Sequence, residues 1–331
     1  MQKTSIKRIF SLAMAFGLAV SFVGGSAVNA QQTAGNSGNG IRISPVRTDL
    51  VMNPGESRQI GITIANLTAG TAEYQVMIND FIAGQNELGQ PSLILDSDKF
   101  APSHSLKRYM QTIPNTTVGA GQSKELKVSI SIPKDAAAGG YYGAVRFAPA
   151  KSGDSTKNVT LAASVGSLIL VKVPGDIKEN ITLDSFDVRN GVNASGGSSF
   201  FTSNKDLYAV ARFKNAGNVH EQPFGKITLK RGGKVLQTIE INNTDPRGNV
   251  LPDSIRRFES KLTKVGFWGK YQVDGNFGYG SNGQLLSATS TFYVLPVVLI
   301  LVVLGLLALL AIALFVLPKQ LRNRKKVNRR R

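Results

Sequence analysis

Short runs in which apolar and polar residues alternate recur along most of the chain, and they constrain its fold more than any other feature. In NPGESRQIGITIANLT, which begins at Asn53, every second residue from Ile60 to Ile64 is apolar, and in AGQSKELKVSISIPK the same holds from Leu126 to Ile132. A period of two is that of a β-strand with one buried face. In a sandwich of seven strands the second and fifth strands are neighbours in one sheet, so these two runs are predicted to pair.

Further runs with the same alternation, separated by Gly, Pro, Asn and Asp, predict an all-β chain. The candidate strands are 41–48, 58–66, 73–81, 106–113, 124–132, 141–148 and 158–172, then 181–189, 207–215, 226–230, 235–242, 255–262, 269–277 and 284–294. The stretch KVPGDIKEN divides the two sets, which places a boundary near Pro174–Gly175. The predicted fold is two tandem Ig-like β-sandwich domains, residues 41–174 and 175–294, plus one C-terminal transmembrane helix.

Local turn chemistry predicts two hairpins in the second domain. In ITLKRGGKVLQTIEIN, Gly232 and Gly233 supply the positive φ that tight hairpin turns require. The run DGNFGYGSNGQ looks like a phosphate-binding loop, but a strand pattern follows it instead of a helix, so a hairpin is expected. Tyr141 or Tyr142, and Tyr271, begin the sixth run of their domains, where a tyrosine hydroxyl commonly bonds back to an upstream loop. An ordinary core aromatic is the alternative there.

The N-terminal 30 residues have the pattern of a secretory signal peptide. Basic residues at the start precede an apolar run from Ile9 to about Val23, and small residues at Val28 and Ala30 suggest cleavage after Ala30. An uncleaved membrane anchor is the alternative. Residues 31–40, QQTAGNSGNG, are a polar linker with nothing to bury.

Residues 295–317 carry no polar or charged side chain, and at 1.5 Å per residue they are long enough to cross a bilayer as a helix. Residues 318–331, PKQLRNRKKVNRRR, contain eight Lys or Arg and no acid. Basic residues that flank a span stay in the cytoplasm, so the N-terminus and the bulk of the chain are expected outside and the C-terminus inside. Phe292 and Tyr293 are expected at the outer lipid boundary.

The net charge of +18 lies mostly in these two ends. Removing the three basic residues of the leader and the eight of the tail leaves 39 − 11 = 28 basic against 21 acidic residues, or +7, in the outer region. Such a balance favours weak, salt-sensitive attraction to anionic wall polymers or lipid headgroups, and it does not imply a nucleic-acid partner.

The chain has no cysteine, which excludes disulfides, thiolate zinc sites and cysteine nucleophiles. The outer domains must therefore be stabilised by burial of full-sized cores. Six Asn-x-Ser/Thr sequons would be glycan sites in a eukaryote, but the absence of cysteine favours a bacterial source, where these residues serve turns and strand ends. They are Asn66, Asn115, Asn158, Asn180, Asn193 and Asn242.

No motif for catalysis, a cofactor or a metal emerges, and the chain is not predicted to be an enzyme. The only histidines, His104 and His220, fall in different predicted domains without spaced partners, and His220 is read as a loop residue. Asp96, Asp98 and the stretch Asn243–Asn249 have too few ligands for a calcium loop. No catalytic, cofactor-binding or metal-binding residue is assigned.

The stretches ISPVRTDLVMNPGESRQIGITIANLT and KELKVSISIPKDAAAGGYYGAVRF resemble the WxL-interacting proteins of Gram-positive cell surfaces. The motifs S-P-x-R/K, P-G-E, N-x-T and G-Y-Y-G carry the resemblance. It implies a peptidoglycan-binding sandwich, a second sandwich that contacts host proteins, a C-terminal helix and a short basic tail. The same order runs over nearly the whole chain, and no site residue is transferred by the resemblance.

The sequence thus predicts a membrane-anchored cell-surface binding protein whose sandwiches contact a peptidoglycan-like wall polymer or a surface or host protein. The opening strand pattern also looks like the first domain of periplasmic pilus chaperones, which anchor a subunit and lend it a strand edge. A membrane-tethered module of that kind is the alternative function. The oligomeric state is left open.

Overall fold

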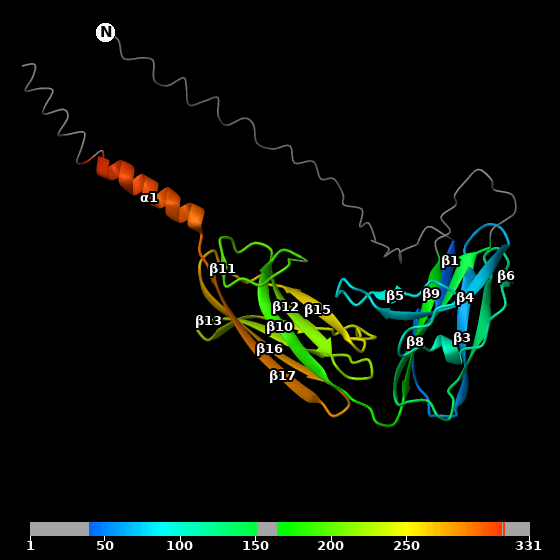
Figure 1. Cartoon of the computed structure of the whole chain (residues 1–331). Coiled ribbons are helices and arrows are strands. Elements are labelled where there is room, and N and C mark those ends of the chain that lie inside the picture. Colours follow the sequence, from blue (N-terminus) through cyan, green and yellow to red (C-terminus); the bar gives the residue numbers. More distant parts are fainter. Residues whose placement is uncertain (1–39, 151–163, 193, 313, 315–331) are drawn as a thin grey trace, which may run out of the picture. The chain divides into compact units, whose positions relative to one another are not determined.

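A computed structural model describes residues 40–150, 164–192, 194–312 and 314. These residues form two β-sandwiches followed by one helix, as the colour order of Figure 1 shows. The chain is therefore mainly β, as predicted. The predicted signal peptide, residues 31–39 of the linker and the basic tail lie outside the described residues.

The first sandwich consists of two sheets that share one core. The smaller sheet has the order β1–β3–β7, and the larger has the order β2–β9–β8–β4–β5, with β6 also paired to β4. Buried residues from both sheets, Ile62, Val128, Phe147 and Val171 among them, form a single cluster. The strands are β1 (Ile41–Ser44), β2 (Arg47–Val51), β3 (Ser57–Asn66), β4 (Ala72–Ala83), β5 (Pro91–Leu93), β6 (Thr116–Val118), β7 (Ser123–Ser131), β8 (Gly139–Pro149) and β9 (Val165–Val173).

The two similar alternating runs pair as predicted. They form β3 and β7, which are antiparallel with Ile60 opposite Val128 and Ile62 opposite Leu126. Ile62 and Val128 are fully buried, so both strands turn their apolar rows into the core. The repeated pattern is therefore scaffold.

Two predicted strands of the first sandwich are wrong. The run 41–48 is divided at Pro45, which has no amide hydrogen to give to a ladder. Its first half, β1, pairs antiparallel with β3, and its second half, β2, pairs parallel with β9 in the other sheet. The run 106–113 instead contains a short 3₁₀ helix at Lys107–Tyr109. The short strands β5 and β6 were not predicted.

The second sandwich has sheets of order β10–β12–β15 and β11–β17–β16–β13–β14. Gly232 and Gly233, with φ of 57° and 80°, join β13 to β14, and Gly280 and Gly283 stand at the turn between β16 and β17, so both predicted hairpins are present. The strands are β10 (Ile181–Asn190), β11 (Phe200–Phe201), β12 (Leu207–Asn215), β13 (Phe224–Arg231), β14 (Lys234–Ile241), β15 (Ser254–Lys261), β16 (Gly269–Tyr279) and β17 (Gln284–Val294).

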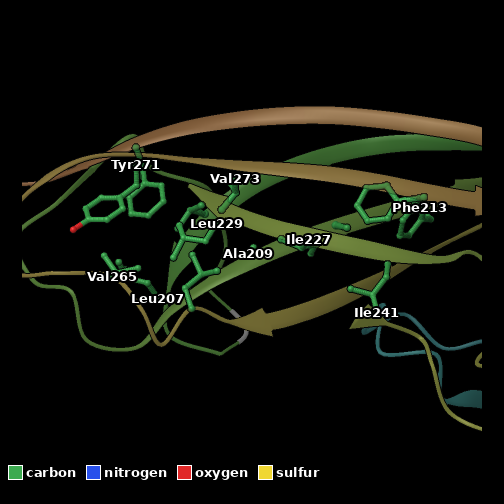
Figure 2. Packing of buried hydrophobic residues seen from close by; sticks show 14 of the residues in the cluster. Leu207, Ala209, Phe213, Ile227, Leu229, Ile241, Val265, Tyr271 and Val273 are labelled. Atoms are coloured by element: carbon green, nitrogen blue, oxygen red, sulfur yellow. The ribbon is translucent and has the colours of Figure 1, made fainter. Parts of the chain in front are cut away.

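Aromatic residues fill much of the core of the second sandwich, part of which is seen in Figure 2. The ring of Phe213 on β12 lies 5.0 Å from that of Phe277 on β16, at an interplanar angle of 89°. Edge-to-face contacts of this kind add to the free energy gained by burial. The core thus joins the two sheets through large rings instead of disulfides.

Two of the predicted tyrosines bond back to upstream loops. The Tyr271 hydroxyl accepts the Gly266 N–H at 2.8 Å and donates to the Trp268 carbonyl at 3.3 Å. The Tyr141 hydroxyl donates to the Ala137 carbonyl at 2.9 Å. Tyr271 is also almost fully buried and stacks on Phe292, so it serves the core as well.

The final element is helix α1 (Val297–Ala311). Its 15 residues are all exposed, and every side chain that it carries is apolar. Within the described part of the chain, no helix has both the length and the apolar character needed to span a bilayer. Residues 313 and 315–317 of the predicted span lie outside that part. The expectation for Phe292 is wrong, because its side chain lies in the sandwich core with no exposed surface.

Candidate functional site

A groove of about 480 Å³ lies on the first sandwich beside β4. Residues 75–79 of β4 form one side of it. The loop after β5 contributes Leu95, Ser97 and Phe100, and the segment from Lys107 to Ile113 contributes the rest of the lining. The groove therefore combines one rigid strand with two loop segments, an arrangement common in binding sites.

The carboxylate of Asp80 holds the loop segments of this groove in place. Asp80 follows directly after the β4 residues 75–79 that line the groove, and it is fully buried. It accepts hydrogen bonds from the Ala101 N–H at 2.9 Å, the Ser105 hydroxyl at 2.6 Å and the Lys107 N–H at 2.9 Å. Charge-assisted bonds to a buried carboxylate are among the stronger hydrogen bonds in proteins. Asp80 is a positioning residue, since it fixes the backbone from which the groove residues project.

Two cations flank an exposed aromatic ring at the groove. The Phe100 ring is 40% exposed, and the Arg108 guanidinium carbon and Lys107 Nζ lie 4.3 Å and 4.9 Å from its centroid. Lys107 Nζ also donates to the carbonyls of Ser97 and Lys99 at 2.5 Å and 3.1 Å. Among the described residues, no carboxylate lies within ion-pair distance of either cation. Neither positive charge is therefore neutralised by a carboxylate of this part of the chain.

The floor of the groove is less polar. Val76, Ile78 and Met110 are half-buried and pack against the core of the sandwich. Asn79 is buried, but its amide is occupied, because it donates to the Ile94 carbonyl and accepts from Arg146. The groove thus offers apolar side chains, the partly exposed Phe100 ring and two cations. This combination suits a ligand that has both apolar surface and carboxylates.

Phe100, Lys107 and Arg108 were not among the candidate residues predicted from the sequence. The two histidines were considered from the sequence, and the structure places both beside the ring of Tyr142. His104 and His220 lie on Tyr142, with ring centroids 5.8 Å and 5.7 Å away. Burial lowers the pKa of His220 to about 4, so this ring is neutral at pH 7. Together with the buried, unbonded Tyr142 hydroxyl, these residues form a packing cluster.

Beside His220, the carboxyl of Glu221 is mostly buried and accepts the Gly280 N–H at 3.1 Å. Its pKa is raised to about 7, chiefly by burial and in smaller part by the charge of Glu179, while Lys172 and the Gly280 N–H oppose the shift. The folded state therefore binds this proton more tightly than the unfolded state, whose carboxyl titrates near 4.5. The stabilisation is fully present below about pH 4.5 and is lost as the pH rises through about 7.

The variant Glu221→Gln, which is neutral at every pH, is expected to be more stable than the parent at pH 8 by about 2 kcal/mol, after allowance for partial solvent screening. The difference should vanish near pH 4, where the parent carboxyl is protonated. Urea unfolding of both proteins at the two pH values measures it. Equal stability of the two at pH 8 would contradict the assigned shift.

Asp96 belongs to one of the two stretches considered for calcium, and its carboxylate already has partners within the protein. Asp96 pairs with Lys99 at 3.2 Å and accepts from the backbone of Asp98. Hydrogen bonds from the Asp98 backbone and from Lys99 lower the pKa of Asp96. Over the described ranges, no group of three or more His, Asp or Glu side chains converges on a point that could hold a metal ion.

Comparison with known proteins places the groove within a named domain. Residues 48–149 match a protein family described as WxL Interacting Protein, peptidoglycan binding domain, and every residue that lines the groove falls in that range. No curated protein matches the chain.

Solved structures with a similar arrangement include several fimbrial chaperones. The class 5 fimbriae chaperone CfaA has 12% identity and a TM-score of 0.36, with coverage of 76% of this chain and 98% of its own. The Escherichia coli chaperone DraB has 16% identity, a TM-score of 0.32 and coverage of 77% and 96%. The Pseudomonas aeruginosa CupB2 chaperone has 11% identity and a TM-score of 0.32, with coverage of 75% of this chain and 98% of its own.

The resemblance seen in the sequence motifs of the first sandwich is therefore confirmed by the family match. Over residues 48–149, this chain therefore matches the peptidoglycan binding domain of the WxL interacting protein family.

Proposed function

We propose that the protein binds peptidoglycan at the cell surface and that the groove beside β4 is the contact site. The observation that carries this proposal is the position of the groove, whose entire lining falls inside the matched range 48–149. The proposed function is binding, because the groove presents a partly exposed aromatic ring flanked by two cations.

Peptidoglycan consists of glycan strands with short peptides, and these peptides carry carboxylates. The Arg108 guanidinium can pair with such a carboxylate through two parallel hydrogen bonds, and Lys107 supplies a second positive charge. The exposed part of the Phe100 ring offers an apolar surface for the sugar or for an alanine methyl group. Because both cations are close to solvent, the interaction should weaken as salt is added.

A wall-pelleting experiment tests this proposal. The purified protein in detergent is mixed with isolated cell wall, and the fraction that sediments is measured at low and high salt. The variant Arg108→Gln is expected to weaken binding about fivefold at low salt, since an exposed charged contact contributes about 1 kcal/mol. Arg42→Gln, which removes an equal charge from an exposed position on β1, is the matched control and should bind like the parent.

Two outcomes would count against the proposal. If neither the parent nor the control sediments with the wall at any salt concentration, wall binding is excluded. Equal loss in Arg108→Gln and Arg42→Gln would mean that the protein is attracted by net charge alone, and that the groove is not the site.

The anchoring of the protein remains part of the proposal. The exposed apolar surface of α1, together with the apolar sequence that continues to Leu317 and the basic tail after it, supports a single membrane crossing with the sandwiches outside. The domains would then be 41–174 and 175–294, with the second next to the bilayer. Protease added to intact cells should remove both sandwiches, and their protection would exclude this topology.

A further inference from the structure

We propose that the end of the second sandwich nearest α1 lies on an anionic lipid surface, with Phe267 and Trp268 inserted among the headgroups. This proposal rests on the membrane crossing of α1 put forward above. It concerns a separate surface from the wall-binding groove and a different partner, the bilayer itself.

Phe267 and Trp268 form an exposed aromatic pair in the loop between β15 and β16. Their side chains are 60% and 54% exposed, and their ring centroids lie 6.3 Å apart. Burying two such rings is a large source of free energy, so adjacent exposed rings mark a contact surface. Trp in particular favours the boundary between lipid and water, because its ring is apolar and its N–H is polar.

The loop holds this pair outward by several specific contacts. Leu262 and Val265 are buried in the core on one side of the pair. On the other side the Tyr271 hydroxyl bonds to both Gly266 and the Trp268 carbonyl. The loop therefore already holds both rings in an exposed position. Binding to a surface would then require little rearrangement of the loop and little loss of conformational entropy.

Positive charges surround the aromatic pair. Lys264 in this loop and Lys270 at the start of β16 are exposed, and Arg231 and Lys234 are exposed at the tip of the β13–β14 hairpin. The Arg231 guanidinium lies 5.7 Å from the Trp268 ring, which places the hairpin tip beside the loop. Among the described residues, none of these four cations forms an ion pair with a carboxylate. Unpaired cations around exposed aromatic rings fit lipid phosphates.

The strand register places this surface at the start of the helix. Gly269 lies opposite Val294 and Lys270 opposite Tyr293, so the loop ends where β17 ends. Helix α1 begins three residues after Val294, and Figure 1 shows β17 running into it. The exposed Phe200 ring stacks on Tyr293 at 5.2 Å, which adds aromatic surface at the same level.

Lipid is therefore the occupant that the observations favour. A protein partner could cover the aromatic rings, but it would not account for their position at the start of an all-apolar, all-exposed helix. If α1 lies in the bilayer, the two-residue connection keeps these rings within reach of the headgroups. The surface would limit the swing of the second sandwich over the membrane.

Trp268 is the only tryptophan in the chain, so its fluorescence reports on this loop without a label. The full chain is reconstituted in vesicles of phosphatidylglycerol and phosphatidylcholine and compared with the chain in detergent. Nitroxide lipids labelled near the headgroup are expected to quench Trp268 more than lipids labelled deep in the acyl chain. Quenching by iodide should fall about threefold in vesicles relative to detergent, because the ring leaves water.

Charge variants test the role of the cations. The double variant Lys264→Gln and Lys270→Gln is expected to reduce the headgroup-label quenching by roughly half. Lys214→Gln changes an exposed lysine at the far end of β12 and should behave like the parent. Circular dichroism verifies that each variant is folded.

An alkaline wash of the vesicles separates the membrane crossing of α1 from the lipid contact of Phe267 and Trp268. If the chain is removed by the wash, α1 does not cross the bilayer and both proposals fail. If the chain stays but iodide quenches Trp268 as strongly as in detergent, only the lipid-contact proposal fails. Wall pelleting by the groove is measured independently and is unaffected by either result.

Discussion

Replacing Asp80 with alanine is expected to lower the free energy of unfolding by about 4 kcal/mol and to remove wall binding. The carboxylate is fully buried and accepts three hydrogen bonds from the segment Ala101–Lys107. Alanine would leave those donors without partners, and each unpaired buried donor costs about 1–3 kcal/mol. Because this segment includes Lys107 and joins Phe100 to Arg108, the geometry of the site should be lost together with the stability.

Urea unfolding monitored by circular dichroism, followed by wall pelleting under folding conditions, measures both effects. Asp80→Asn keeps the shape and one acceptor oxygen, so it should cost less than the alanine variant. Asp98→Ala, at an exposed position of the nearby loop, should change stability by less than about 0.5 kcal/mol. If Asp80→Ala unfolds within about 1 kcal/mol of the parent and binds wall normally, the positioning role assigned to this carboxylate is wrong.

Features that depend on local pattern could be predicted from the sequence. The strands β3 and β7 and their pairing followed from alternation, since a single buried face fixes both the period and the inward row. The turn at Gly232 and Gly233 followed from backbone chemistry, because few other residues adopt a positive φ there. These signals are carried by neighbouring residues, so they survive without knowledge of the tertiary fold.

The segment 106–113 shows why other features could not be predicted. Its residues alternate well enough for a strand, yet the chain makes a turn at Lys107–Tyr109, where the Tyr109 N–H donates to the Leu106 carbonyl at 2.9 Å. The turn is held by Asp80, whose carboxylate accepts the Lys107 N–H from 27 positions away in sequence. Tertiary contacts of this kind override local preference, and no window of neighbouring residues contains them.

The candidate site had one signal in the sequence. Asp80 follows Tyr74, Val76 and Ile78 at a spacing of two, so a carboxylate stands on the apolar face of a predicted strand. A buried acid needs partners, and that requirement indicates an organised loop nearby. The identity of those partners, and the meeting of Phe100 with Arg108, depended on the fold. The same holds for the two histidines, which are 116 positions apart and share one tyrosine ring.

Truncating Phe213 to alanine is expected to destabilise the second sandwich by about 3–5 kcal/mol, the usual cost of removing a fully buried ring. Its ring packs edge-on against Phe277 at 5.0 Å and Phe258 at 5.8 Å, and Figure 2 shows it within the buried cluster. Thermal unfolding of the full chain, followed by near-ultraviolet circular dichroism, should show a lower transition temperature.

Two further variants separate the causes of that loss. Phe213→Leu retains most of the apolar volume and loses the edge-to-face contacts, so it should cost less than the alanine variant but more than nothing. Phe258→Ala truncates a partly buried neighbour and should cost less than Phe213→Ala, because less surface leaves water there. Wall pelleting at a temperature below the transition should be unchanged in all three, since the groove is built from first-sandwich residues alone. If Phe213→Ala lost wall binding while still folded, the binding site would have to include the second sandwich, and the groove beside β4 would not be sufficient for it.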